Sequence, residues 1–386
     1  MTKEMKARAI TRSPGFHWFG YYDKWQFDPS DRYVLGMRVD FEHRLPDADD
    51  AVAIGMIDLA QGNRWTDLGQ SRAWSWQQGC MLQWRPGSAE KILFNDREGE
   101  RHVCRVLNVR TRHVRTLPQA IGTVSPCGRF ALCDDYRRIW NFRAGYGYAG
   151  IADAHAAETA PSTIGVWRMD LETGAHDLIV SVADLARIPY PGQAAGDRHY
   201  INHLAWNPAG DRFLMFNRWP GDRQPTRVFT AAADGSDLRL LSAHGASHWT
   251  WRDPEHVLIW GEGAYRLYRD NGSGEPVATV WEHPNGHQSY IPGTDNEWLL
   301  TDTYPAGTPE RQELCLYHIP TRRKVLLAQL EARPKEVGCQ WRGEWRCDLH
   351  PRLNRRATQV VVDSEHTAAG RQMYLFDIED ILRERL

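Results

Sequence analysis

A unit that recurs seven times along the chain is the feature that most restricts how it can fold. Each copy has an aromatic or apolar residue, a short turn rich in Pro, Gly and Asp, and then an apolar strand. Turns of this composition join neighbouring antiparallel strands, so each copy predicts a β-hairpin. The seven copies are FDPSDRYVLGM from Phe27, WRPGSAEKILF from Trp84, VSPCGRFALC from Val124, WNPAGDRFLMF from Trp206, WRDPEHVLIW from Trp251, IPGTDNEWLLTD from Ile291 and HPRLNRRATQVVVD from His350.

The length of the repeat indicates the architecture. Dividing 386 residues by seven gives about 55 residues per copy, which suits a four-stranded β-propeller blade with loop insertions. Most copies are followed by a second strand that ends in a turn, such as GVWRMDLETG from Gly165. The pattern predicts an all-β chain that forms one seven-bladed β-propeller domain over residues 1–386, with six or eight blades as the alternatives.

Two segments depart from the repeat. Residues 136–163 carry no strand pattern and lie in the longest gap between repeated turns, so we expect an insertion of functional or irregular structure within the third blade. The last copy lacks room for a fourth strand after MYLFDIED. Residues 5–12 are therefore expected to pair with residues 373–378 as the outermost strand, closing the ring and leaving no exposed sheet edge. Helix signals are confined to the C-terminal DIEDILRERL and a short stretch near Val180.

Composition excludes several classes of function. The 47 basic and 49 acidic residues give a net charge of -2, without the basic field that drives nucleic-acid binding. No apolar run is long enough for a membrane-spanning helix, and the N-terminus lacks the apolar core of a secretory signal, so we expect a cytoplasmic protein. The seven cysteines contain no C-x-x-C pair, which argues against a zinc ribbon, a thioredoxin-type site or a disulfide framework. No partner chain is indicated, and the sequence does not define an oligomeric state.

Histidines recur just ahead of the repeated turns, at positions that line the central channel of a propeller. His203, His248 and His287 lie five or six residues before the turn prolines of their copies. A single such histidine is more often structural than functional, but several converging on one axis form a ligand set for Zn or Mn and supply a general base near neutral pH. Other channel candidates at comparable positions are His17, Tyr22, Gln78, Asp348 and His350.

Arginines and aromatic residues form two further groups. Arg218, Arg227 and Arg346 lie at strand ends of the same copies, and a guanidinium pairs two-pronged with a carboxylate, although most arginines of this chain are expected in surface pairs. The 17 Trp, 14 Tyr and 11 Phe suit a β-rich core and also flat surfaces on which sugar rings stack. The chain lacks a phosphate-binding P-loop, a G-x-S-x-G elbow and an H-E-x-x-H motif.

The C-terminal half of the chain resembles the oligogalacturonate lyases, and more broadly the bacterial WD40-like propellers. The resemblance covers residues 200 to 380 and rests on SHWTWRDPEHVLIW around His248, GHQSY around His287, and CDLHPR with QVVVDSEHTAAGRQMYLF around His350. It implies His248 as the base and Arg227, in PTRVF, as a catalytic arginine. Where the family has Gln-x-x-His-x-His in the last blade, this chain has Trp345, Asp348 and His350.

The resemblance implies a polysaccharide lyase that cleaves an acidic, uronic-acid-containing oligosaccharide by β-elimination, with a divalent metal, Mn or Zn, held by His287, Asp348 and His350. Such an enzyme removes the proton on C5, next to the sugar carboxylate, and expels the C4 oxygen, which requires a cation and a base. The alternatives are a non-enzymatic TolB-like or WD40-like platform that binds glycans or proteins, and a different hydrolase or isomerase. The residues expected to bind substrate are His17, Tyr22, Gln78, His203, Arg218, Tyr290 and Arg346.

Overall fold

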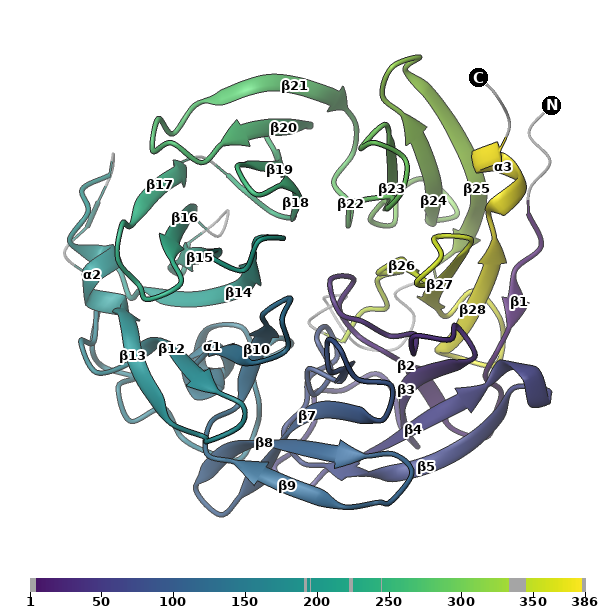
Figure 1. Ribbon diagram of the computed structural model, residues 1–386, viewed down its shortest axis with the longest axis horizontal. Helices are drawn as coiled ribbons and strands as arrows, with labels where there is room; N and C mark the ends of the chain where they lie inside the picture. The colour runs from purple at the N-terminus through teal and green to yellow at the C-terminus, as the bar shows by residue number, and fades with distance from the viewer. Residues whose placement is uncertain are drawn as a thin grey trace.

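Seven antiparallel sheets of four strands each surround a central axis in the computed structural model (Figure 1). The structure describes residues 5–190, 193–194, 196–221, 225–243, 245–332 and 345–383. Each sheet is one blade, and its first strand in chain order lies nearest the axis in every blade except the one that closes the ring. The chain is therefore the seven-bladed β-propeller that the repeat predicts.

Each blade is a meander of consecutive strands. The first four blades are formed by β2 (Phe16–Trp18), β3 (Tyr33–Val39), β4 (Val52–Asp58) and β5 (Arg64–Ser71); β6 (Gln83–Trp84), β7 (Lys91–Glu98), β8 (Arg101–Asn108) and β9 (Val114–Leu117); β10 (Ile121–Val124), β11 (Phe130–Cys133), β12 (Gly165–Asp170) and β13 (His176–Ser181); and β14 (Tyr200–Trp206), β15 (Arg212–Arg218), β16 (Thr226–Ala232) and β17 (Arg239–Ser242). The other three are formed by β18 (Trp249–Asp253), β19 (His256–Gly261), β20 (Ala264–Arg269) and β21 (Pro276–Glu282); β22 (Ser289–Tyr290), β23 (Trp298–Asp302), β24 (Arg311–His318) and β25 (Arg323–Glu331); and β26 (Arg352–Leu353), β27 (Gln359–Ser364), β28 (Gln372–Asp377) and β1 (Arg8–Ala9).

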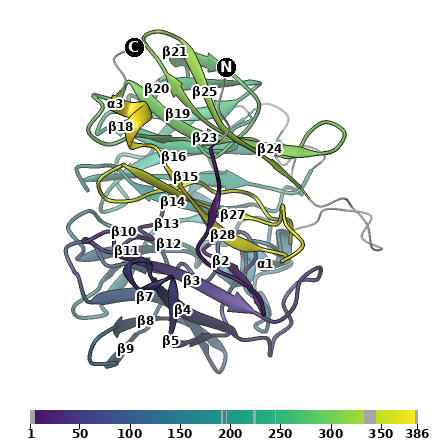
Figure 2. The ribbon, with the colours of Figure 1, turned by 90° about the vertical axis from the view of Figure 1, so that its right-hand side faces the viewer.

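The N-terminal segment closes the ring. β1 pairs with β28, with Arg8 opposite Leu375 and Ala9 opposite Tyr374, and the backbone N–H of Ile10 donates to the carbonyl of Met373 (2.9 Å). Figure 2 shows β1 running beside β28 at the side of the ring where both chain ends lie. The expected closure by residues 5–12 is thus confirmed, and Ile10 is buried at this seam.

The repeated turns join the first and second strands of the blades, and their polar residues explain why they recur. In the fourth blade, the Asn207 side-chain oxygen accepts from the backbone N–H groups of Gly210 and Arg212 (2.8 and 3.2 Å). Asp28 does the same in the first blade by accepting from the backbone of Tyr33 (2.7 Å), and Asn354 does so in the last by accepting from Gln359 (3.0 Å). A short polar side chain ahead of the turn satisfies backbone donors that the turn leaves unpaired.

Three short helices and a 3-10 turn complete the described structure. α2 (Val182–Ala186) and α3 (Glu379–Arg383) correspond to the two helix signals of the sequence, and η1 (Leu59–Gln61) follows β4. α1 (Tyr136–Phe142) lies in the insertion of the third blade, between β11 and β12. This helix was not expected, because its signal is short: the Asp135 side chain accepts from the backbone N–H groups at its start and caps it.

Apolar side chains between neighbouring blades make the core, and tryptophans contribute much of it. Trp18, Trp74 and Trp76 are fully buried and pack together with ring centroids 4.9 to 5.5 Å apart. Cysteines are also mostly core residues: five of the six described ones are buried and Cys127 is exposed, while Cys339 lies outside the described residues. Among the described segments, no helix has both the length and the apolar character needed to cross a membrane.

Candidate active site

Four histidines from four successive blades meet in the central channel. His203 lies on β14, and His248, His287 and His350 lie just before β18, β22 and β26. The ring centroids of His248 and His287 are 4.0 Å apart, and those of His287 and His350 are 4.2 Å apart. The Tyr21 ring lies 5.1 Å from both His203 and His350 and joins the fourth histidine to the other three.

Local backbone geometry turns two of these histidines into the channel. His203 has φ 57° and His350 has φ 43°, both in the left-handed region, where histidine is more common than most residues. His203 also lies where the pairing of β14 with β15 shifts register between Asn202 and Ala205. An extra residue at such a bulge re-aims the side chains around it, which is a common device beside functional sites.

One buried carboxylate links the blades that carry His287 and His350. Asp302, the last residue of β23, accepts from Nδ1 of His287 (2.9 Å), from the His287 backbone N–H (2.6 Å) and from the His350 backbone N–H (3.1 Å). These contacts place the proton of His287 on Nδ1 and leave its Nε2 with a free lone pair. A carboxylate behind a histidine is the usual outer-shell arrangement of a metal ligand.

A metal fits this group. The Nε2 atoms of His287 and His350 are buried and have no hydrogen-bond partner. The potential ligand atoms of His287, Asp348 and His350 all lie within 4.8 Å of one another, and all three residues are buried. Two imidazoles and a carboxylate are a ligand set for Mn or Zn. Asp348 also accepts from Arg346 Nε (2.9 Å), so its carboxylate is oriented as well.

His248 is held in a single orientation by the loop that precedes β22. Its Nδ1 donates to the Asn285 side-chain oxygen (2.9 Å), and Asn285 in turn donates to the Ser247 hydroxyl (3.0 Å). Its Nε2 therefore carries the lone pair, and the hydroxyl of Tyr304 lies 3.4 Å from it. Burial lowers the pKa of His248 well below its ordinary value, and the neighbouring His287 lowers it further, so the imidazole is neutral at neutral pH.

A cavity of about 200 Å³ opens beside His248, and we call it the histidine pocket. Two arginines face it without a carboxylate among its lining residues: Arg143, which ends α1, and Arg218, which ends β15. Arg218 is buried, its Nε has no hydrogen-bond partner, and burial together with the nearby Arg143 lowers its pKa. The pocket is lined by Arg143, Tyr146, His203, Arg218, Thr226, Gly245, Ala246, Ser247, His248, Trp260, Asn285 and Tyr304. It is therefore a concave, positively charged site suited to a small anion.

Several other residues expected to bind substrate lie close to the histidines. Gln78 contacts Nδ1 of His203 through its amide nitrogen (3.3 Å). Arg346 donates to the Tyr146 hydroxyl (3.2 Å), which brings it to the edge of the histidine pocket. Tyr22 packs its ring 5.3 Å from that of His287.

Three of the expected site residues lie elsewhere. His17 is twelve residues ahead of its turn proline, not five or six, and it lies outside the channel. Its Nδ1 contacts Gln372 (3.0 Å), and its ring packs on Trp65. Tyr290 is three residues beyond His287 and lies at the other end of the channel. Arg227 donates to the carbonyls of Leu185 and Ile188, at the end of α2.

The placement of Arg227 follows from the pleat of the sheet. Arg218 is paired with Thr226, and both line the histidine pocket, whereas Arg227 is paired with Asn217 on the opposite face. The expectation that Arg227 is a catalytic residue is thus corrected by the geometry: its guanidinium faces away from the pocket and is held by backbone carbonyls. Arg218 and Arg143 are the arginines that the structure presents to a ligand.

Sequence reasoning missed Arg143, Asn285, Asp302 and Tyr304. Arg143 lies in the insertion, and its neighbour Tyr146 belonged to an excess of aromatic residues noted there. Asn285 is two residues before His287 in the sequence, but its contact is with His248 of the preceding blade, which no spacing along the chain indicates. Asp302 ends β23 and Tyr304 follows two residues later, and because the sequence predicts this strand from its apolar pattern alone, no local signal marks either residue.

Comparison with known proteins identifies the fold but not the family. No protein-family model matches the chain, and no curated protein matches it in sequence. Among solved structures, an oligogalacturonate lyase in complex with manganese is similar, with a TM-score of 0.69 and 14% identity, over 99% of this chain and 96% of that one. The oligogalacturonate lyase of Vibrio parahaemolyticus is similar with a TM-score of 0.67 and 12% identity, over 99% and 97% of the two chains.

A puromycin-hydrolyzing peptidase of Mycobacterium tuberculosis is also similar, with a TM-score of 0.55 and 14% identity, but 99% of this chain covers only 55% of that protein. The two lyases, in contrast, are matched over 96% and 97% of their own length. At these identities the likeness concerns the path of the backbone. The chain therefore has the seven-bladed β-propeller fold of oligogalacturonate lyase.

Proposed function

We propose that this protein is a metal-assisted lyase that cleaves an acidic, uronic-acid-containing oligosaccharide by β-elimination. The observation that carries the proposal is the histidine pocket, in which two arginines and a neutral imidazole face one cavity beside a metal-ligand group. The fold shared with oligogalacturonate lyase over 99% of the chain supports it. The groups that the reaction requires lie in this pocket or in the metal-ligand group beside it.

Binding of the sugar carboxylate is the first demand. Arg143 and Arg218 line the pocket, and a planar guanidinium binds a carboxylate through two parallel hydrogen bonds. Arg218 Nε lacks a partner within the protein, so a bound carboxylate satisfies a donor that is otherwise left buried and unpaired. Neutralising the carboxylate makes the neighbouring C5 proton more acidic, which lowers the barrier to its removal.

Removal of the C5 proton is the second demand. His248 is buried and neutral. Its Nδ1–H donates to Asn285, so Nε2 is the ring atom that accepts a proton. When Nε2 takes the proton, the C5–H electron pair forms the C4–C5 double bond and the C4–O bond breaks. The oxygen keeps the C4–O electron pair, takes a proton from water and leaves as a hydroxyl on the second half of the oligosaccharide. The hydroxyl of Tyr304 lies beside Nε2 and orients the imidazole.

The metal is the third component. His287, Asp348 and His350 are the residues that would hold a divalent cation, and Asp302 fixes the orientation of His287. When bound, such a cation supplies positive charge to the substrate carboxylate and so acidifies the C5 proton. Burial lowers the pKa of His350 well below its ordinary value, which keeps its imidazole neutral near neutral pH, the form in which a ring nitrogen can bind a metal.

Two substitutions separate the base from the metal group. With short oligogalacturonates as substrate, His248→Ala is expected to lower turnover on the order of 10²–10⁴-fold, because it removes a general base, while metal content and substrate affinity stay near those of the parent. His350→Ala is expected to lose bound metal and to weaken substrate binding. Turnover is followed by the ultraviolet absorbance of the unsaturated product, and metal content by elemental analysis.

His113→Ala is the matched control, because His113 is exposed on the outer hairpin of the second blade. It is expected to leave turnover, metal content and affinity unchanged. If the parent protein forms no unsaturated product from any uronate oligomer, or if both channel variants keep full turnover, the lyase proposal is wrong. Binding of the oligomer without cleavage then favours the non-enzymatic platform.

A further inference from the structure

A second and larger cavity lies at the opposite end of the channel from the histidine pocket. It has a volume of about 490 Å³, within the range of about 300–1,000 Å³ usual for small-molecule sites. Consecutive residues at the start of β18 define the two ends: Ser247 and His248, just before the strand, line the histidine pocket, whereas Trp249, Thr250 and Trp251 within it line this cavity. The prolines of four repeated turns also border it, so we call it the turn-side pocket.

Aromatic side chains form the walls of the turn-side pocket. Trp25, Trp206, Trp251 and Tyr290 line it, from four different blades or their turns. Trp25 is 40% exposed, a high value for tryptophan, yet the Arg355 guanidinium lies 3.8 Å over its ring and holds it in place. Trp251 is oriented by a hydrogen bond from its indole N–H to the Ala205 carbonyl (3.4 Å). Flat, fixed aromatic faces of this kind pack on the C–H faces of a sugar ring.

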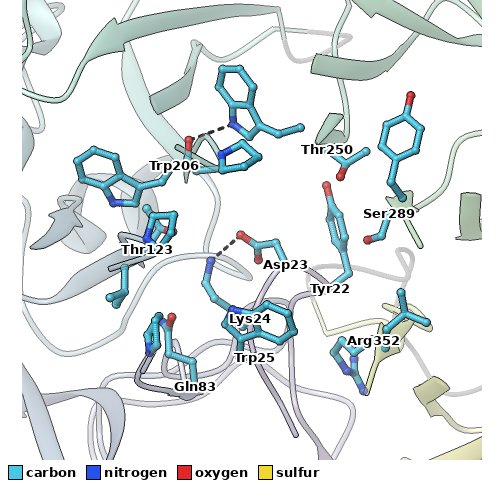
Figure 3. Close-up of a pocket in the computed structure, with 18 of the residues that line it drawn as sticks. Tyr22, Asp23, Lys24, Trp25, Gln83, Thr123, Trp206, Thr250, Ser289 and Arg352 are labelled. Atoms are coloured by element: carbon cyan, nitrogen blue, oxygen red, sulfur yellow. Dashed lines mark hydrogen bonds and ion pairs between the residues drawn. The ribbon is translucent and has the colours of Figure 1, made fainter. Parts of the chain in front are cut away.

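Polar atoms at the floor of this pocket lack partners. Figure 3 shows the Asp23 carboxylate and the Lys24 ammonium side by side in the middle of the view, between Trp206 and Tyr22. Asp23 Oδ2 contacts Lys24 Nζ (2.6 Å), but Asp23 Oδ1 is buried without a hydrogen-bond partner. The indole nitrogen of Trp206, a residue only 8% exposed, is also without a partner. An acceptor and a donor are therefore both left for a ligand to satisfy.

The charges in the pocket select a neutral ligand. The Asp23–Lys24 pair is neutral as a whole, and the third charged lining residue, Arg352, is already paired with Asp363 (2.7 Å). The Lys24 ammonium repels a cationic ligand, and the Asp23 carboxylate repels an anionic ligand. The hydroxyls of Thr250 and Ser289 line the same space. From the aromatic walls, the unpaired acceptor and donor, and the balanced charge, we propose that the turn-side pocket binds a neutral sugar ring.

This site is separate from the proposed chemistry. The Tyr22 hydroxyl donates to the Trp249 carbonyl (2.6 Å) and accepts from the Trp249 backbone N–H (3.0 Å), and both residues line the turn-side pocket but not the histidine pocket. None of Trp25, Trp251 and Asp23 lines the histidine pocket. Occupation of the turn-side pocket therefore needs neither metal nor His248, and the inference stands whether or not the protein is a lyase.

The test uses two neutral disaccharides, lactose and cellobiose, with the full-length protein. Saturation-transfer difference NMR is expected to show binding of at least one of them, and a titration gives its Kd. Trp25→Ala, Trp251→Ala and Asp23→Asn are each expected to weaken that binding by tenfold or more. Trp281→Ala, a tryptophan on the outer strand of the fifth blade, is the matched control and leaves the Kd unchanged.

His248→Ala provides the second control, because it alters the histidine pocket alone and is expected to keep the disaccharide Kd of the parent. Circular dichroism of each variant confirms that the fold is retained, and Trp25→Ala is the decisive variant because its side chain is partly exposed. Absence of binding by both disaccharides overturns the proposal. So does binding that all three pocket variants leave unchanged, or a clear preference for adenosine, a flat and equally neutral ligand, over both sugars.

Discussion

At the scale of single residues, Asp302 organises the candidate metal group although it is not one of the three ligands. Its two oxygens contact the ring and the backbone of His287 in the sixth blade and the backbone of His350 in the seventh. It therefore sets both the tautomer of one ligand and the distance between two blades. Because it is buried among donors, no other residue type of similar size replaces all of its contacts.

Asp302→Asn tests this role. The amide presents an N–H where the carboxylate accepts, so His287 loses the partner that orients it, and metal affinity is expected to fall roughly 10–100-fold. Titration calorimetry with Mn²⁺ measures the change. Asp295→Asn, on an exposed turn of the same blade, is the control and is expected to bind Mn²⁺ as the parent does. An unchanged affinity in Asp302→Asn would show that the carboxylate does not orient a metal ligand.

A second residue-scale contrast is that between Arg227 and Arg218. Arg227 donates to three oxygens, from Leu185, Ile188 and Asn217, and its guanidinium stacks over Tyr190. Arg218 ends the neighbouring strand and faces the histidine pocket. The first arginine is thus part of the framework that holds α2 against the fourth blade, whereas the second is available to a ligand.

Substitution of Arg227 is expected to lower stability, whereas substitution of Arg218 is expected to weaken substrate binding. Arg227→Ala leaves buried carbonyls without donors and is expected to lower the free energy of unfolding by about 2–4 kcal/mol, measured by urea denaturation. Arg218→Ala is expected to weaken binding of oligogalacturonate at least tenfold with a smaller effect on stability. A stable Arg227→Ala protein without turnover would restore Arg227 to a catalytic role.

At the scale of elements, ring closure depends on the two-residue strand β1. It supplies the outer edge of the last blade, which is otherwise three strands wide, and the buried Ile10 follows directly after it. A propeller closed in this way joins the two ends of the chain by hydrogen bonds, so that opening the ring requires this edge to separate.

Deletion of residues 1–12 is expected to expose the edge of β28 and to leave the Ile10 site empty. The result is a lower melting temperature, with a loss of several kcal/mol in unfolding free energy, and concentration-dependent aggregation through the free edge. Differential scanning calorimetry and light scattering measure the two effects. Ile10→Ala is a milder companion, expected to cost about 2–4 kcal/mol without aggregation. A soluble deletion variant with the parent's melting temperature would contradict closure by this strand.

At the scale of the whole molecule, buried neutral histidines couple the stability of the propeller to pH. Burial lowers the pKa of His17, His102, His199 and His283 to about 4, against an ordinary value of about 6.5 in an unfolded chain. Between these two values the unfolded chain binds more protons than the folded one. The free energy of unfolding therefore falls as the pH falls from about 6.5 to about 4, and these groups add no pH dependence above that window.

The midpoint of urea denaturation is expected to decrease steadily as the pH is lowered from 6.5 to 4. These histidines contribute almost no change in the midpoint between pH 7 and pH 8. His199→Gln, which replaces one titrating ring by a neutral amide, is expected to reduce the slope in the acidic window. A midpoint that stays constant or rises on acidification would show that the folded protein binds protons at least as readily as the unfolded chain, and therefore that the pKa values of these rings are not lowered by burial.

The sequence by itself determined the number of blades, the position of each first hairpin and the strand that closes the ring. These features are local: Asp28, Asn207 and Asn354, ahead of three of the turns, accept backbone N–H groups a few residues away, and apolar alternation fixes which face of a strand is buried. Because the same local pattern occurs seven times, a misassigned turn or strand in one copy can be recognised by comparison with the other six. The approach of His203, His248 and His287 to the channel follows from their shared register ahead of the turns.

Only the tertiary structure decided which polar groups join those histidines. Arg143 enters the histidine pocket from an insertion, and Asp302 reaches across two blades, so no spacing along the chain reveals either. Arg227 was expected in the pocket but faces away from it, because neighbouring residues of a strand face opposite sides of the sheet. Thr226 therefore lines the pocket, whereas Arg227, the next residue, is held by framework contacts. His17 lies outside the channel because its blade has a longer link to the turn, which places Tyr21 and Tyr22 against the histidines instead. Pairing across the sheet and between blades sets these contacts, and it is a property of the folded ring, not of any single segment.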